Sequence, residues 1–186
     1  MEKLVLHPNV FILEDFLTKT ECLHFINVGE KAGFEAAKVQ VGGAQQSLIT
    51  GIRNNERVEY NNQRLADELW KRFETFAPVL QDHQAVGLNE MFRFYKYTPG
   101  QRFKMHRDGN FTRNTQERSF YTFLMYLNDD FDGGGTEFKD LFTVSPKQGS
   151  LLVFFHPLKH EGKILTAGTK YVLRSDIMYR LQGTGN

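Results

Sequence analysis

From Gly87 onward the sequence consists of short stretches rich in aromatic residues, separated by glycine and proline turns. Aromatic side chains suit the pleated surface of a sheet, so these stretches predict strands. Ser119–Leu127 is the clearest of them, and Pro99-Gly100 and Gly133–Gly135 supply turns. Many short strands with such turns are typical of a β-sandwich or a barrel. The expected strands are residues 89–97, 103–106, 119–127, 136–138, 142–144, 150–155 and 171–181.

The residues before Gly87 predict two helices and a few further strands. Thr18 and Glu21 have the spacing of a capping box, so a helix is expected to begin there and to end at Gly29 or Gly33. Apolar residues recur at helical spacing over residues 62–76, which predicts a second helix. The remaining expectations are a strand at 10–16, two short strands around Gly42-Gly43, and a strand end or loop at 53–57.

Length and composition indicate one globular domain. The chain has 186 residues, of which 40% are hydrophobic and 24% charged. No linker divides it, so we expect a single domain over residues 1–186, with a helical and strand cover at 1–88 and a β-core at 89–181. The net charge of +1 gives no bulk attraction to nucleic acid or anionic lipid. Cys22 is the sole cysteine, and no stretch reads as a signal peptide or membrane span, so a cytoplasmic location is expected.

The tripeptide His106-Arg107-Asp108 is a candidate metal site. On an extended strand, residues two positions apart point to the same face, so the imidazole and the carboxylate can reach one point. They would be two of the three ligands of a 2-His-1-carboxylate facial triad, which holds Fe(II). The third ligand must be another histidine. His7, His24 and His83 read as surface residues, which leaves two candidates after the strand at 151–155, namely His156 and His160.

Further residues extend this pattern and carry a family resemblance. Tyr97 stands nine residues before His106, and Lys170 stands ten residues after His160. With Thr122–Leu127, Gly134–Phe138 and Pro146–Ser150, this arrangement resembles the Fe(II)/2-oxoglutarate-dependent dioxygenase superfamily, specifically its prolyl 4-hydroxylase-like branch. The resemblance covers nearly the whole chain and is densest over residues 93–179. The spacing to Lys170 favours His160 over His156 as the third ligand.

The resemblance implies a fold, cofactors and a reaction. The fold would be a double-stranded β-helix, or jelly roll, with the N-terminal helices packed on its major sheet. The cofactors would be Fe(II), 2-oxoglutarate and O2, with ascorbate as an optional addition. The reaction would be hydroxylation of an unactivated C–H group of a peptide or protein side chain, or of an amino-acid-like small molecule, with release of succinate and CO2. The implied metal ligands are His106, Asp108 and His160, and the implied cosubstrate-binding residues are Tyr97, Thr122, Leu124, Tyr126 and Lys170.

Two polar stretches are candidates for substrate contact. Residues 53–57 and the segment 109–118, which is expected to be a mobile loop over the site, are both expected to be exposed near the open face of the metal. In the resembled branch an arginine before the second helix often faces the site, and Arg53 is similar to it. We therefore expect Arg53, with Asn55, to orient a carbonyl or carboxylate of the substrate. A solvated loop charge is the competing interpretation of Arg53.

Other functions for the same residues stay open. A jelly roll could hold a different metal and act as a hydrolase or isomerase. Those reactions do not need a buried cation such as Lys170 to bind a dicarboxylate. A nucleic-acid demethylase of the same superfamily would usually carry arginine at that position and a basic surface. A non-catalytic relative would be expected to have lost a ligand, and a halogenase would lack the carboxylate of Asp108.

Overall fold

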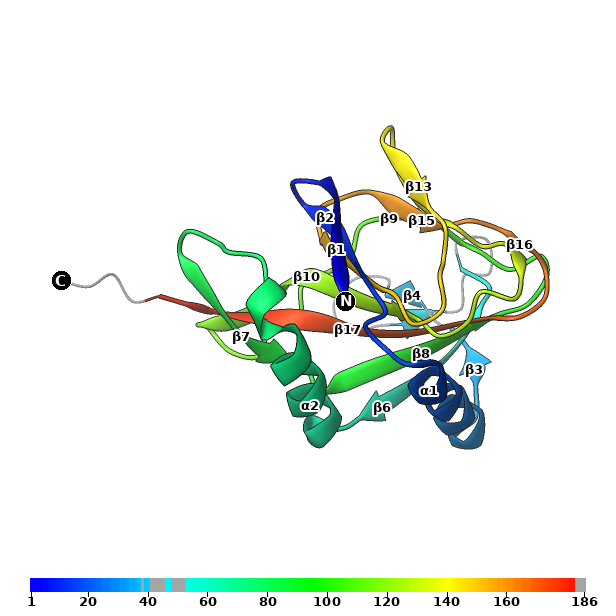
Figure 1. Cartoon of the computed structure of the whole chain (residues 1–186), viewed down its shortest axis with the longest axis horizontal. Helices are drawn as coiled ribbons and strands as arrows, with labels where there is room; N and C mark the ends of the chain where they lie inside the picture. The colour runs from blue at the N-terminus through cyan, green and yellow to red at the C-terminus, as the bar shows by residue number, and fades with distance from the viewer. Residues whose placement is uncertain (38, 41–45, 48–52, 183–186) are drawn as a thin grey trace.

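The computed structural model describes residues 1–37, 39–40, 46–47 and 53–182 (Figure 1). These residues form α1 (Lys19–Ala32), α2 (Gln63–Phe73) and a short 3-10 helix, η1 (Glu74–Phe76). The strands are β1 (Glu2–His7), β2 (Val10–Glu14), β3 (Glu35–Ala36), β4 (Val39–Gln40), β5 (Gln46–Ser47), β6 (Glu56–Asn61), β7 (His83–Leu88), β8 (Met91–Tyr97), β9 (Phe103–His106), β10 (Glu117–Tyr126), β11 (Asp132–Gly133), β12 (Thr136–Phe138), β13 (Phe142–Val144), β14 (Leu151–Phe155), β15 (His160–Gly162), β16 (Leu165–Ala167) and β17 (Lys170–Leu181).

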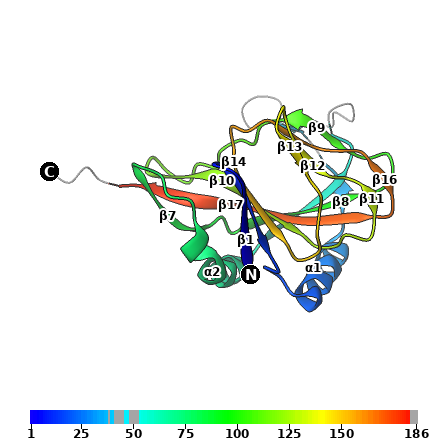
Figure 2. The same ribbon diagram turned by 45° about the horizontal axis from the view of Figure 1, so that its top comes forward.

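Most strands of the described residues form a large and a small antiparallel sheet, and β4-β5 and β11-β16 form two further two-stranded sheets. The large sheet has the order β1-β2-β14-β10-β17-β8-β6-β3, and β7 pairs with the far half of β17. β17 is its longest strand, and β10 runs along the other edge of β17 over ten residues. The small sheet has the order β13-β12-β15-β9 and lies opposite the large one (Figures 1 and 2). The expected double-stranded β-helix is confirmed.

The large sheet buries both of its faces, and the helices cover one of them. Successive residues of a strand point to opposite faces. Phe123 and Leu173 pack toward α1 and α2, which lie on the side of the sheet away from β13 and β15 (Figure 1). Tyr126 and Val172 point to the other face, where they pack with Phe138 of the small sheet. The layer between the two sheets is therefore a second core, and the candidate site lies within it.

The two predicted helices are confirmed, and their N-terminal ends are capped by side chains. Thr18 accepts from the backbone N–H of Glu21, and the Glu21 carboxylate accepts from the backbone N–H of Thr18, which completes the capping box. Such a cap contributes about 1 kcal/mol to helix stability. Asn62 caps α2 in the same way through the backbone N–H of Leu65. Arg72 of α2 pairs with Glu21 at 2.7 Å and so joins the two helices.

Several strands were absent from the sequence-based expectation, namely β1, β3, β6, β7, β11, β15 and β16. β6 (Glu56–Asn61) is a partner of β8, but three of its six residues are charged and only Val58 and Tyr60 are apolar, which is a short and weak alternation. β4 and β5 are the two short strands expected around Gly42-Gly43, and they pair with each other. Gly42-Gly43 itself lies outside the described residues. None of the helices in the described part of the chain is both long and apolar enough to cross a membrane.

Candidate functional site

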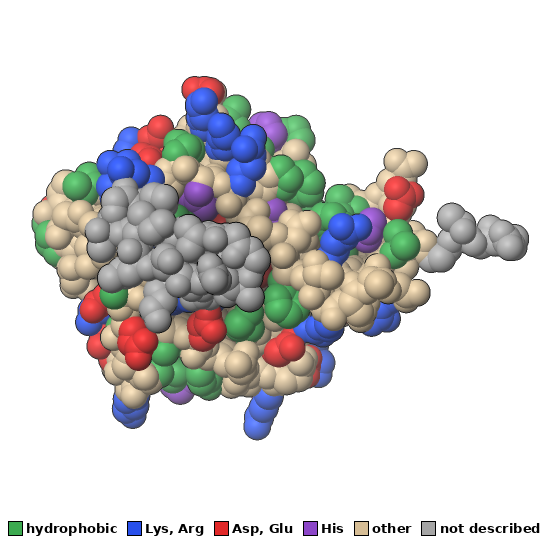
Figure 3. Space-filling model, turned by 180° about the vertical axis from the view of Figure 1, so that it is seen from behind, with side chains coloured by type: hydrophobic (Ala, Val, Ile, Leu, Met, Phe, Trp, Pro, Cys, Tyr) green, Lys and Arg blue, Asp and Glu red, His purple; other side chains and the backbone are tan. Residues whose placement is uncertain are grey.

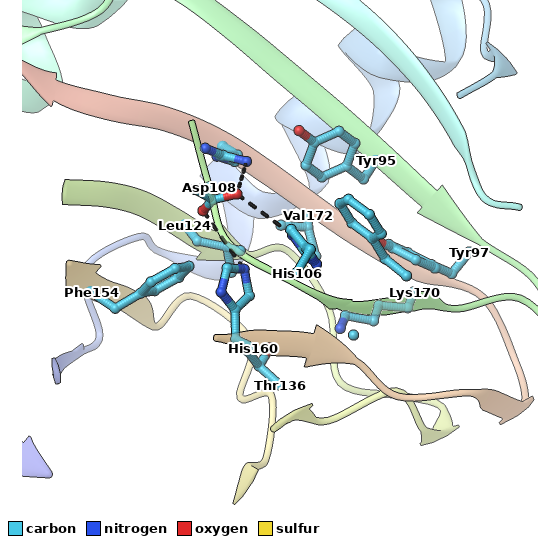
Figure 4. A pocket seen from close by; sticks show the side chains of 13 residues that line it. Tyr95, Tyr97, His106, Asp108, Leu124, Thr136, Phe154, His160, Lys170 and Val172 are labelled. Atoms are coloured by element: carbon cyan, nitrogen blue, oxygen red, sulfur yellow. Dashed lines mark hydrogen bonds and ion pairs between the residues drawn. The ribbon is translucent and has the colours of Figure 1, made fainter. Parts of the chain in front are cut away.

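Three predicted metal ligands converge between the two sheets. His106 ends β9 and His160 begins β15, and the two residues are directly paired across these strands. Asp108 completes the group, and one ligand atom from each residue lies within 4.8 Å of the others (Figure 4). The Asp108 carboxylate oxygens are 3.6 Å from Nε2 of His106 and 3.7 Å from Nε2 of His160. Two imidazoles and one carboxylate are a donor set suited to a divalent transition metal.

His106 and His160 are both oriented so that Nε2 is the ring nitrogen free to bind a metal. Nδ1 of His106 lies 2.7 Å from the carbonyl oxygen of Lys104, and Nδ1 of His160 lies 3.0 Å from that of Leu158. A carbonyl only accepts, so each Nδ1 carries the proton and each Nε2 keeps its lone pair for a metal. Burial lowers the pKa of His160 to about 4, which keeps its ring neutral at pH 7. The ring of Phe103 stacks on His106 with centroids 3.6 Å apart and fixes its plane.

Asp108 reaches the group differently from the sequence-based expectation. β9 ends at His106, so Asp108 lies in the coil after the strand and does not share a strand with His106. Its carboxylate is held from the large sheet, where Thr122 donates to one oxygen at 2.5 Å and Arg174 donates to the other at 2.9 Å. Burial alone would raise the pKa of Asp108, but the Arg174 guanidinium beside it holds that pKa well below its ordinary value. The carboxylate is therefore ionised, as a metal ligand must be.

Lys170 lies at the closed end of the same cavity. Its ammonium group is 5.4 Å from the ring centroids of both Tyr97 and Tyr126 and donates to the carbonyl of Gly134 at 2.5 Å. No carboxylate pairs with it among the described residues, and burial lowers its pKa to about 7. A buried ammonium group without a counter-ion carries a free-energy cost. An anionic group that entered this end of the cavity would remove that cost.

One cavity connects the three ligands with Lys170 (Figure 4). Leu124 and Val172 supply apolar wall between the two ends, and Gly162 leaves room beside the hydroxyl of Tyr97. Two residues expected at the cosubstrate have other partners. The hydroxyl of Thr122 donates to Asp108, and that of Tyr126 shares a hydrogen bond of 2.7 Å with Thr136. The cavity lining consists of Tyr95, Tyr97, Phe103, His106, Asp108, Leu124, Thr136, Phe154, His160, Gly162, Lys170, Val172 and Arg174.

Arg53 and Asn55 are buried, which corrects the expectation of an exposed substrate loop. The guanidinium carbon of Arg53 lies 4.5 Å from the ring centroid of Tyr95 and 4.4 Å from that of Phe103. Since Phe103 stacks on His106, Arg53 is one ring away from a candidate metal ligand. Its Nε donates to Asn55 at 2.7 Å, while its Nη2 is buried without a hydrogen-bond partner in the described part of the chain. Apolar and aromatic packing outweighs solvation at this arginine.

The segment 109–118 is tied to the protein body at several points. Arg113 forms ion pairs with Glu90 and Glu117, and Asn110 contacts Nδ1 of His156 at 3.1 Å. Glu117 already belongs to β10. His156, the rejected candidate for the third ligand, is fully buried with its Nε2 3.5 Å from Asp176 and lies outside the metal-ligand group.

Arg174 is the main residue that the sequence interpretation did not place in the site. Arg174 pairs with Asp176, two residues further along β17, at 3.0 Å. The same guanidinium also binds Asp108, 66 residues earlier in the chain. Arg174 could have been placed in the site from its spacing to Lys170. Alternate residues of a strand point to the same face, so Lys170, Val172 and Arg174 must share one face of β17. Tyr95 could have been found by the same argument from Tyr97.

Comparisons with known proteins agree with this geometry. A family model described as the 2OG-Fe(II) oxygenase superfamily matches residues 92–175. Prolyl 4-hydroxylase 5 of Arabidopsis thaliana is 29% identical over 143 residues, which cover 70% of this chain and 45% of the relative. The chain spans about half the length of the curated relatives it matches, with shares of 59%, 47% and 45% for three of them.

Two solved structures show the same fold. A prolyl hydroxylase from Trichoplax adhaerens, in complex with a peptide fragment of the hypoxia inducible factor oxygen degradation domain, superimposes with a TM-score of 0.70 at 19% identity, over 91% of this chain and 83% of the other. A viral collagen prolyl hydroxylase from Paramecium bursaria chlorella virus 1, in a 2OG complex, gives a TM-score of 0.66 at 17% identity, over 94% of this chain and 97% of the other.

Proposed function

We propose that the chain belongs to the Fe(II)/2-oxoglutarate-dependent dioxygenase superfamily and that it hydroxylates an unactivated C–H group with consumption of 2-oxoglutarate and O2. The products derived from the cosubstrate are succinate and CO2. The proposal rests mainly on one observation. The ligand atoms of His106, Asp108 and His160 lie within 4.8 Å of one another in the cavity that Lys170 also lines.

The residues present fit both the metal and the cosubstrate. Two neutral imidazoles and an ionised carboxylate suit Fe(II), and the three leave further coordination positions for other ligands. Lys170 is a buried cation without a counter-ion among the described residues, which is what the distal carboxylate of a dicarboxylate requires. When bound, Fe(II) with 2-oxoglutarate and O2 supplies the oxidising power of the reaction.

The protein itself contributes binding, orientation and exclusion of water. His106, Asp108 and His160 hold the metal, and Lys170 holds the far end of the cosubstrate. The hydroxyl of Tyr97 faces the cavity next to Lys170, and burial raises its pKa to about 12, so it stays protonated and can donate a hydrogen bond. Leu124 forms apolar wall that limits the access of water between the two ends.

The proposed substrate is a peptide or protein side chain, or an amino-acid-like small molecule. Two observations support it: several relatives carry the name prolyl 4-hydroxylase, and Arg53 keeps one buried nitrogen without a hydrogen-bond partner among the described residues, one ring away from His106. A nucleic-acid substrate finds less support, because basic and acidic side chains are interspersed on the face drawn in Figure 3. Cytoplasmic location remains part of the proposal.

The deciding experiment is a screen for substrate-dependent succinate release. Purified protein with Fe(II), 2-oxoglutarate and O2 is given proline-containing peptides, other peptides and free amino acids, and succinate is measured by mass spectrometry. The proposal expects a low rate of succinate formation without any substrate and a higher rate with one class of the panel. Absence of 2-oxoglutarate consumption under all conditions, with metal bound, would contradict it.

A second experiment tests the role of Arg53. Arg53→Met keeps an unbranched side chain between the rings of Tyr95 and Phe103 but removes every hydrogen-bond donor. We expect this variant to lose substrate-stimulated turnover and to keep the uncoupled consumption of 2-oxoglutarate. Equal loss of both rates would indicate that Arg53 only supports the stack on His106.

A further inference from the structure

The three metal ligands differ in how they are anchored. His106 and His160 belong to strands that pair with each other, and a backbone carbonyl fixes each ring. Asp108 lies in coil, and no backbone pairing of the described residues fixes its position. Its carboxylate is held by two side chains of the opposite sheet, Thr122 and Arg174. The geometry of the third ligand therefore depends on residues distant in sequence.

Arg174 is itself held on its other side. Its second terminal nitrogen donates to Asp176 at 3.0 Å, so the planar guanidinium spans two carboxylates. Asp176 in turn lies 3.5 Å from Arg93 and 3.5 Å from His156. The side chains of Asp108, Arg174 and Asp176 are only 3%, 12% and 2% exposed. A rigid fork between fixed partners can set the direction of a carboxylate, which one flexible ammonium group cannot do.

A contribution to the stability of the fold is a weak explanation for this network of buried charges. A buried ion network is costly to desolvate, and apolar residues of similar size are often as stabilising in its place. In addition, Arg93 and Arg174 are directly opposite each other on β8 and β17, and like charges in that position oppose sheet formation. Because the network has these costs, we infer that it serves to hold the Asp108 carboxylate in one orientation.

We propose that Arg174 is a positioning residue, which holds the carboxylate of Asp108 toward His106 and His160 so that the three ligands are already arranged before a metal binds. Asp176 fixes the guanidinium in that orientation. The inference rests on the proposed function, because it presupposes that these three residues bind a metal. It concerns binding of the metal and makes Arg174 neither a ligand nor a group that touches the reacting atoms.

Replacement of Arg174 should raise or lower the affinity for a metal depending on its role. The direction of that change therefore distinguishes a positioning role from an effect of its charge alone. A positive guanidinium beside the site repels a divalent cation. If Arg174 acted only through its charge, its removal would strengthen metal binding, and replacement by lysine would change little. If Arg174 positions Asp108, both replacements weaken binding, because lysine keeps the charge but cannot bridge Asp108 and Asp176.

The experiment measures binding of Mn(II) alone, by calorimetry, to the full chain and to three variants. Substitutions of residues that orient metal ligands typically weaken metal binding about 10–100-fold. We expect Arg174→Met to weaken Mn(II) binding within that range, and Arg174→Lys to weaken it by a smaller factor that is still measurable. Arg180→Met is the matched control, since Arg180 lies on the same strand but pairs with Glu117, outside the cavity. It should bind Mn(II) as the unmodified chain does.

A spectroscopic measurement distinguishes positioning from a general structural role. The absorption bands of Co(II) depend on the arrangement of its ligands, so folded Arg174→Lys loaded with Co(II) should show an altered spectrum, and Arg180→Met an unaltered one. If Arg174→Met fails to fold, the Mn(II) affinity of Arg174→Lys tests the proposal, because a purely electrostatic effect predicts little change in that affinity. Unchanged Mn(II) affinity in folded Arg174→Lys, or tighter binding in Arg174→Met, overturns the proposal. Absence of Mn(II) binding in the unmodified chain would overturn both this inference and the proposed metal site.

Discussion

Lys170 stands directly opposite Tyr97 in the β17–β8 pair, and its ammonium group lies 5.4 Å from the centroid of the Tyr97 ring. This pairing places a cation and a phenol hydroxyl at the same end of the cavity. A carboxylate that enters there can meet both a charge and a hydrogen-bond donor. The register of two strands thus defines the expected anchor for the cosubstrate.

Replacement of Lys170 by methionine should weaken 2-oxoglutarate binding. The variant keeps an unbranched side chain that is one atom shorter, and it loses a charge-assisted hydrogen bond of about 1.5–3 kcal/mol. That energy corresponds to roughly a tenfold to hundredfold higher dissociation constant. Calorimetry in the presence of Mn(II) measures it, with Lys96→Met as control, because Lys96 pairs with Glu30 on the helical side of the sheet. Equal affinity in wild type and Lys170→Met would show that the anchor has been assigned to the wrong residue.

The same lysine should make the stability of the metal-free protein depend on pH. Burial lowers the pKa of Lys170 from an ordinary value of 10.5 to about 7. Between these two values the unfolded chain binds more protons than the folded one, so the free energy of unfolding rises with pH across this window. Lys170→Met should lack that rise. Denaturant unfolding at several pH values measures the difference, and parallel curves for the two proteins would contradict the assignment.

Loss of a metal ligand should abolish metal binding. His106→Ala removes one of three ligands and should weaken Mn(II) binding by more than the roughly 100-fold upper value for residues that only support ligands. Asp108→Ala should do the same and also destabilise the fold by about 3 kcal/mol, since Arg174 is left buried with Asp176 as its remaining partner. His24→Ala on the exposed side of α1 is the control. Retention of Mn(II) by both ligand variants would refute the site.

Gly134 should be sensitive to a single added methyl group. Its φ of +63° is strained for other residues, and a Cβ there would lie 2.9 Å from Leu165 and 3.2 Å from the Lys170 side chain. Gly134→Ala should therefore cost about 1–2 kcal/mol of stability and also weaken 2-oxoglutarate binding. Gly33→Ala has a similar positive φ with nothing within 4 Å, so it should lose stability only. Identical 2-oxoglutarate affinity in the two variants would show that Gly134 does not affect the position of Lys170.

Local spacing in the sequence was sufficient for the elements that depend on neighbouring residues. The capping box at Thr18 and Glu21 predicted the start of α1, and the aromatic run predicted β10. The candidate ligands were found in the same way, although the choice of His160 required a family resemblance. β6 was missed, because a six-residue strand with three charged residues has only a weak local signal and depends on β8 as its pairing partner.

By itself the sequence determined which side chains share a face of a strand, because that alternation is a local property of the backbone. Only the tertiary structure decided which strands meet. Pairing of β9 with β15 brings His160 to His106, and packing of the two sheets brings Arg174 to Asp108 and encloses Arg53 between two rings. These contacts join residues far apart in the chain. Their register follows from the burial of whole strand faces, which no short stretch of sequence specifies.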